Sequence, residues 1–144
     1  MIKVDVNDLN EFSVKILKLS QEVEENVKKV VKNSAFKIQK EAMSNLTKNK
    51  SVATGHLRRA VSTDIKGLEA TVHTSNVKYA IMVEKGTKAH LIKPKNKKML
   101  YWKGASHPVR IVRHPGSRAK PFLEPAFEKE KDQFLEKLKE VIKW

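Results

Sequence analysis

The chain has 144 residues, 40% of them apolar, and carries 30 Lys and Arg against 16 Asp and Glu, for a formal net charge of +14. This length predicts a single domain, and the absence of cysteine excludes disulfides, thiolate metal sites and cysteine nucleophiles. The first residues are not those of a secretory signal, and no apolar run approaches the roughly 20 residues of a membrane-spanning helix, so we expect a soluble protein that makes no membrane contact.

The positive charge is concentrated in the middle of the chain. Lys and Arg outnumber Asp and Glu by 17 to 3 in residues 47–121, whereas the counts are 8 to 7 before this segment and 5 to 6 after it. No acidic residue lies between Glu84 and Glu124. Self-repulsion disfavours such a concentration in an isolated domain, so we expect a partner that accepts it.

The N-terminal third predicts one long helix. Residues 1–6 alternate apolar and polar side chains as in a short strand, and Asn7 or Asp8 can then cap a helix of about residues 8–46. Apolar residues recur at spacings of three and four, at Leu9, Phe12, Ile16, Leu19, Val23, Val27, Val30, Ile38, Ala42 and Leu46. This stripe is most simply a core-facing surface, although its slow drift also allows a helical neighbour from another subunit.

The middle of the chain predicts short strands joined by loops. Residues 47–54 form a polar loop, and Thr54 can cap a helical turn that presents Arg58 and Arg59. Alternating residues on either side of Gly67, at 61–65 and 70–74, indicate a hairpin.

Three more strands are predicted further along, at residues 79–84, 98–103 and 109–113, because these runs are apolar, aromatic or β-branched. We expect Tyr101 and Trp102 to lie in a core strand. Residues 47–120 would thus hold four or five short, mostly antiparallel strands with an extended basic loop.

A closing amphipathic helix is predicted for about residues 124–143, with Pro125 at its first position, where a missing N–H costs nothing. The whole chain, residues 1–144, is therefore predicted to be one α+β domain.

Residues for catalysis or metal binding are sparse. The five histidines lack paired spacing, so neither a metal site nor a cofactor is expected. No G-x-S-x-G motif or glycine-rich phosphate loop occurs, and Ser75 and the Ser106-His107 pair have no evident positioned base. We do not expect an enzyme; a hydrolase using Ser106 or a histidine would need a substrate that nothing in the sequence suggests.

Several short motifs occur in a fixed order across the basic middle. They are TGHLR at 54–58, YA and VEKGT within 79–87, IKPK at 92–95 followed by KMLYW at 98–102, HPGS at 114–117 and AKPFL at 119–123. This series resembles a tailed-bacteriophage family of neck or minor tail components, named after gene product ten of the coliphage Hong Kong ninety-seven. The resemblance covers about residues 50–127 and includes a helix on either side.

The resemblance implies a structural protein of a phage or prophage, a head–tail joining or tail-completion component that forms a homo-oligomeric ring at the virion neck or tail after assembly in the host cytoplasm. It implies no catalytic residue. Its partners would be other connector and tail proteins, and the protein alone could be monomeric. The motif residues expected at partner or subunit interfaces are Arg58, Glu84, Gly86, Thr87, Pro94, His114, Pro115, Gly116, Pro121 and Phe122.

An alternative is binding of nucleic acid without sequence preference. The central loop of about residues 93–103 combines lysines with two aromatic residues, as in loops that contact phosphates and stack on bases. The candidate contacts to DNA, or equally to an acidic protein partner, are Lys93, Lys95, Lys97, Lys98, Lys103 and Arg110.

Overall fold

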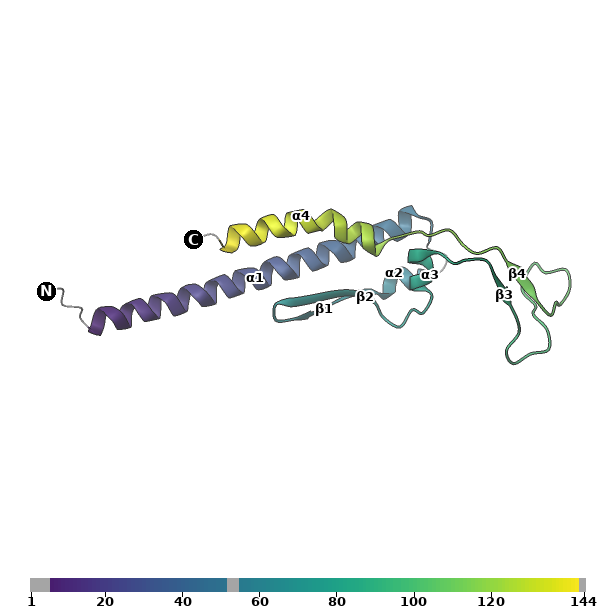
Figure 1. Cartoon of the computed structure of the whole chain (residues 1–144), viewed down its shortest axis with the longest axis horizontal. Coiled ribbons are helices and arrows are strands. Elements are labelled where there is room, and N and C mark those ends of the chain that lie inside the picture. The colour runs from purple at the N-terminus through teal and green to yellow at the C-terminus, as the bar shows by residue number, and fades with distance from the viewer. Residues whose placement is uncertain (1–5, 52–54, 143–144) are drawn as a thin grey trace.

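The computed structural model describes residues 6–51 and 55–142, with side chains from residue 18 onward. It is an elongated α+β arrangement with a helix at each end of the chain (Figure 1). In chain order the elements are α1 (Val6–Lys48), α2 (His56–Ala60), β1 (Val61–Lys66), β2 (Glu69–Thr74), α3 (Ala80–Lys85), β3 (His90–Ile92), β4 (Val112–His114) and α4 (Leu123–Ile142).

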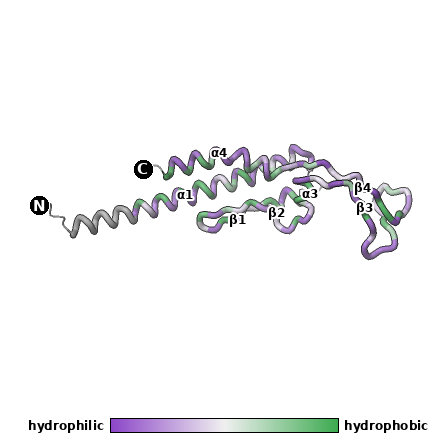
Figure 2. Tube along the Cα trace, in the orientation of Figure 1, coloured by the Kyte–Doolittle hydropathy of each residue, from purple (hydrophilic) through white to green (hydrophobic). Residues whose placement is uncertain are grey.

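The predicted terminal helices pack on each other. Helix α1 has 43 residues, which at 1.5 Å per residue is about 65 Å, and the 20-residue α4 runs antiparallel beside its C-terminal half (Figure 1). In Figure 2, hydrophobic positions recur between hydrophilic ones along α4 and along the coloured part of α1, as the periodicity predicts. The apolar stripe of α1 therefore faces the core over this half.

A small core lies where the end of α1 meets α2, α3 and the start of α4. Leu46 and Phe122 are fully buried in it. The other buried members are Ala42, Leu57, Val61, Val77, Ala80 and Ala126. Asn45 Nδ2 reinforces the packing by donating to the Phe122 carbonyl at 3.1 Å.

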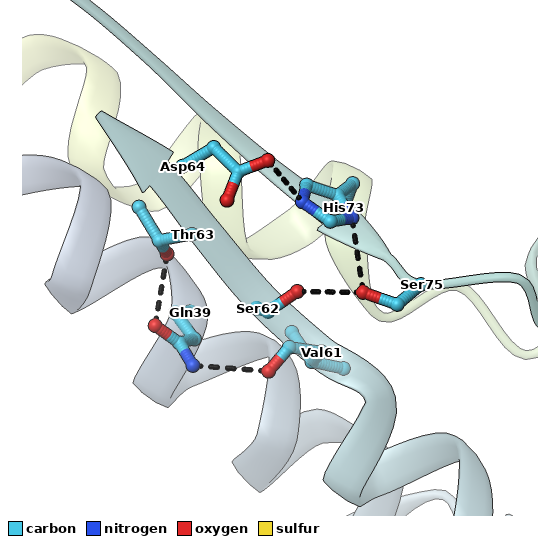
Figure 3. A network of polar contacts seen from close by, with 7 residues as sticks. All are labelled: Gln39, Val61, Ser62, Thr63, Asp64, His73 and Ser75. Carbon is cyan, nitrogen blue, oxygen red and sulfur yellow. Dashed lines mark hydrogen bonds and ion pairs between the residues drawn. The ribbon is translucent and has the colours of Figure 1, made fainter. Parts of the chain in front are cut away.

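The predicted hairpin forms and docks on α1. Strands β1 and β2 pair antiparallel, from Val61 opposite Thr74 to Lys66 opposite Glu69. The Gln39 side chain of α1 donates to the Val61 carbonyl at 3.0 Å and accepts from the Thr63 hydroxyl at 2.8 Å (Figure 3). These bonds hold the hairpin to the helix, and an isolated two-stranded hairpin needs such support.

A second two-stranded unit projects beyond the end of the helix pair (Figure 1). Strands β3 and β4 pair antiparallel, with His90 opposite His114, and single bridges occur at Thr87–Ser117 and Leu100–Val109. We call residues 88–118 the arm; this range begins after Thr87, includes both strands and their loops, and ends just after Ser117.

The strand predictions need correction. The described residues form two separate two-stranded sheets in place of one sheet of four or five strands. Residues 79–84 are not a strand: most of them form helix α3, because a short apolar run fits a buried helix as well as a strand. Residues 98–103 form no strand beyond the bridge at Leu100, and β4 covers only the end of the predicted 109–113 strand.

The helix boundaries differ slightly from those predicted. Helix α1 already begins at Val6, so the strand predicted for residues 1–6 has its last residue in a helix, and residues 1–5 lie outside the described part. The Thr54 cap also falls on a residue outside it. Helix α4 begins at Leu123, which makes Pro125 its third residue, still within the first turn where its missing N–H leaves no hydrogen bond broken.

Candidate functional site

The base of the arm is anchored by one carboxylate. Glu84 Oε2 accepts the backbone N–H groups of Phe122 at 2.8 Å and Leu123 at 3.1 Å, and Oε1 accepts that of Glu124 at 2.9 Å. A helix N-terminus leaves such donors without partners, and a negative charge there also favours the helix dipole. Glu84 therefore caps α4 from helix α3.

Two glycines let the chain cross itself at this base. Thr87 and Ser117 exchange backbone hydrogen bonds of 2.9 and 3.0 Å. A Cβ on Gly86 would lie 2.5 Å from the Ser117 carbonyl oxygen, and one on Gly116 would collide with the Thr87 carbonyl oxygen. Both glycines have positive φ, 71° and 91°. The GT and PGS motifs thus build a tight backbone crossing.

The imidazoles of His90 and His114 stack above this crossing, with ring centroids 5.0 Å apart. His114 Nδ1 accepts the Gly116 N–H at 3.0 Å, and His90 Nδ1 lies 2.9 Å from the Lys88 carbonyl. The motif residues from Glu84 to Thr87 and from His114 to Phe122 therefore contact one another inside the chain. Their role in contacts between subunits stays a prediction.

The remaining predicted interface residues are more peripheral. Arg58 is exposed on α2, and Pro94 is half-buried in the loop after β3. Pro121 precedes the buried Phe122, and its carbonyl accepts from Asn49 Nδ2 at 2.9 Å. Pro115 is exposed between His114 and Gly116.

The arm itself has no core. None of residues 88–118 is buried, and large apolar side chains are open to solvent, with Tyr101 69% and Trp102 49% exposed. The expectation that these two aromatics belong to a core strand is wrong, because no helix packs against the arm. The six predicted basic contacts are all exposed on it: Lys93, Lys95, Lys97, Lys98, Lys103 and Arg110.

A second surface was missed from the sequence. An apolar groove of about 850 Å³ lies between α1, the β1–β2 hairpin and α4. Its walls include Ile38, Leu68, Val72, Phe127, Phe134 and Leu135. Leu68 at the hairpin turn and Phe127 on α4 are each 51% exposed. One feature of the sequence does indicate this groove. The apolar stripe of the last helix is too wide to be covered by a single neighbouring helix.

A polar cluster crosses the helix pair beside this groove. Glu130 is buried, and its Oε1 accepts from the Ser34 hydroxyl at 3.1 Å and lies 3.6 Å from Lys37 Nζ and 3.7 Å from Lys137 Nζ. The nearby Lys37 ammonium and partial burial lower the pKa of Lys137. The cluster provides the buried carboxylate with a hydrogen bond and two nearby cations, and it links α1 to α4.

A second ion pair joins the same two helices. Lys129 Nζ lies 3.0 Å from Glu41 Oε1, and Lys48 Nζ lies 3.6 Å from the same oxygen. The hydrogen bond from Lys129, with a smaller contribution from Lys48, lowers the pKa of the Glu41 carboxyl. The negative charge of Glu41 is thereby stabilised in the folded protein.

A serine, a histidine and an aspartate do meet on the hairpin. His73 Nε2 lies 3.0 Å from Asp64 Oδ2, and His73 Nδ1 lies 3.5 Å from Ser75 Oγ (Figure 3). The serine contact is longer than the 2.6–3.2 Å expected of a nucleophile and its base. The Asp64 side chain is also 68% exposed, so nothing excludes water from the group. This geometry favours a surface hydrogen-bond network.

Two further searches cover only the described residues. No three His, Asp or Glu side chains in residues 18–51 and 55–142 gather closely enough to hold a metal ion. None of the described helices is both long and apolar enough to cross a membrane.

Comparison with protein families matches the chain to a family model described as "Bacteriophage HK97-gp10, putative tail-component", over residues 10–86. These residues include α1 from residue 10 onward, the hairpin, Glu84 and Gly86, and they stop at the base of the arm. Searches of curated proteins and of solved structures gave no match. The match spans more than half of the chain and agrees with the resemblance seen in its motifs, so the chain belongs to the HK97-gp10-like family of phage tail components.

Proposed function

We propose that this protein is a structural component of a tailed phage or prophage virion that acts at the head–tail junction or the tail end. There it forms a ring, joins or completes the tail, and binds other connector and tail proteins. The ring is assembled in the host cytoplasm. The role needs no catalytic residue, cofactor or metal, and the proposal therefore does not include an enzymatic activity.

The exposure of the arm is the observation that supports this proposal. Its base is held by Glu84 and by the Thr87–Ser117 pair, yet residues 88–118 bury no side chain of their own. An exposed patch of apolar residues on an ordered element marks an interaction site. Because the arm projects beyond the helix pair, it is free to reach a neighbouring molecule (Figure 1).

Removal of the gene from the phage tests the proposal. Lysates are imaged by electron microscopy, with the wild-type gene supplied in trans as a control. We expect filled heads and tails that fail to join, or tails with faulty ends, and recovery on complementation. Normal infectious particles without the protein would contradict the role.

A second experiment assigns the defect to the arm. Residues 93–111 are replaced by a short Gly-Ser linker, which leaves the Thr87–Ser117 base intact, and the variant is used for complementation. We expect a folded protein, with unchanged helical circular dichroism, that does not restore particles. Full recovery by this variant would show that the arm is dispensable.

A specific observation also favours nucleic-acid binding as a second candidate. Tyr101 and Trp102 are exposed among Lys97, Lys98 and Lys103, which suits base stacking beside phosphate contacts. Affinity for DNA would then fall steeply with salt, and substituting Lys93, Lys95, Lys97 and Lys98 by Gln would reduce the slope by about three to four units. Absence of DNA and RNA binding at low salt would eliminate this candidate.

A further inference from the structure

The arm and the groove have complementary apolar surfaces. The arm exposes Leu91, Met99, Tyr101, Trp102 and Ile111, each at least 42% open to solvent. The groove exposes Leu68, Phe127 and Leu135, each at least 45% open. Removal of apolar surface from water favours association, so both surfaces favour a contact that covers them.

Their charges are also complementary. The arm contains nine Lys and Arg residues and no Asp or Glu. The charged residues lining the groove are Glu69, Glu124, Glu130 and Lys131. Glu130 is neutralised by Lys37 and Lys137, whereas Glu69 and Glu124 are exposed and have no ion-pair partner among the described residues. Two carboxylates at the groove are thus available to basic side chains from outside.

The two surfaces cannot meet within one chain. The arm projects beyond the C-terminal end of α1 (Figure 1). The groove instead lies beside residues 31–38 of that helix, ten or more residues before its end. The base of the arm is fixed by the Glu84 cap and by the close backbone contacts of Gly86 and Gly116. The arm therefore cannot fold back over the helices.

We propose that the arm of one copy docks in the groove of a second copy, with Tyr101 and Trp102 against Leu68 and Phe127, and with arm lysines facing Glu69 and Glu124. This inference rests on the proposed ring and names the subunit contact that would build it. Because the surface on each partner differs, the contact is head-to-tail, and repetition of such a contact closes a ring when the rotation allows it.

Complementary variants of the purified full-length chain test this contact. Tyr101→Ser/Trp102→Ser alters only the arm, and Leu68→Asp alters only the groove; all three side chains are exposed, so folding should be unaffected. In sedimentation velocity we expect self-association at least about tenfold weaker for each variant alone. An equimolar mixture should form one-to-one dimers and nothing larger, because it retains a single intact arm–groove contact.

Cysteine cross-linking gives an independent readout, since the natural chain has no cysteine. Met99→Cys in the arm is combined with Leu68→Cys in the groove, and the control combines Met99→Cys with Ile81→Cys, an exposed residue of α3 outside the groove. On mild oxidation, the first pair should give a ladder of disulfide-linked copies, and the control should not. The experiment is done both in concentrated solution and in assembled particles, so a ring that requires other virion proteins is also detected.

Three outcomes overturn the docking proposal: cross-linking of the groove pair no greater than the control in both settings, links only between two Met99→Cys arms, or a link from the arm to a different virion protein. Each of these leaves the proposed role in particle assembly intact. The gene-deletion experiment tests that role separately, because it depends on particle formation and not on this contact.

Discussion

The carboxylate of Glu84 accepts the backbone N–H of Phe122 at 2.8 Å across 38 positions of sequence. Glu84 lies in the last turn of its own short helix and also caps the last helix of the chain, so one side chain links α3 to α4. The residue immediately before α4, Phe122, has no polar side chain that could cap the helix itself. The cap must therefore come from elsewhere in the chain, and Glu84, at the start of the acid-free segment, supplies it.

Substitution of Glu84 should uncap α4. Glu84→Ala removes the acceptor of three N–H groups and should lower the free energy of unfolding by about 1–2 kcal/mol, whereas Glu84→Gln keeps one acceptor oxygen and should cost less. Urea denaturation measures the loss, and amide exchange at residues 122–124 should accelerate. Glu69→Ala, at an exposed residue, is the control; equal effects at both positions would argue against the cap.

Substitution of either crossing glycine should open the base of the arm. Gly86→Ala forces a Cβ against Ser117 at φ 71° and ψ −176°, a region that essentially only glycine adopts, and should cost about 1–3 kcal/mol or more. Gly67→Ala is a matched control, because Gly67 also has positive φ but has no atom within 4 Å of the added Cβ. Limited proteolysis of the arm should accelerate in the first variant only.

Truncation of Phe122 should severely weaken the core. Because Phe122 is fully buried, Phe122→Ala should lower the free energy of unfolding by about 3–5 kcal/mol. Phe127→Ala, on α4, is the control. It removes a side chain that is 51% exposed, and it should change the free energy of unfolding by no more than about 0.5 kcal/mol in dilute protein. Thermal melts followed by circular dichroism compare the two; similar losses would contradict the assigned core.

The Glu41–Lys129 pair should make stability depend on pH. The pKa of Glu41 is lowered from its ordinary value of 4.5, so its contribution is present above that value and is lost as the pH falls through the lower pKa of the folded state. Lys129→Gln should reduce stability at pH 7, and the difference from the natural chain should vanish in acid. Unfolding measured across pH, together with NMR titration of Glu41, checks this.

Lys131→Gln is the control for that experiment, since Lys131 lies 3.9 Å from the exposed Glu128 and touches no acid of α1. We expect a smaller, nearly pH-independent difference for it. A Glu41 pKa that is unchanged by Lys129→Gln would show that the ion pair does not stabilise the carboxylate.

The sequence predicted the parts of the fold that depend on local periodicity. The α1 stripe, the hairpin around Gly67 and the closing helix all follow from spacings of three to four or of two. The five apolar residues at 79–83 fit a buried strand and a buried helix equally well, so the predicted strand at 79–84 is wrong; the carbonyl of Tyr79 accepts from Met82 and Val83, as in a helical turn. Whether a short apolar run forms a helix or a strand depends on tertiary contacts, and the spacing of apolar residues does not reveal these contacts.

The candidate site was less predictable for a related reason. The sequence predicts a core strand for Tyr101 and Trp102 because aromatic side chains are usually buried to a large extent, yet both are exposed on an arm that has no core of its own. The groove was not predicted from the sequence either, because Leu68 is a turn residue and only the fold places it on the same groove as Phe127 of α4. Surfaces built from distant segments leave no short motif.

The Thr87–Ser117 pair, 30 positions apart, has a consequence for how this protein can change over evolutionary time. Everything between the two residues leaves and re-enters the body of the protein at one point, so insertions or deletions in the arm need not disturb the helices. Doubling the length of such a loop costs only about 0.6 kcal/mol of closure entropy. The length of the arm can therefore change over evolutionary time while the two helices and the core keep their structure.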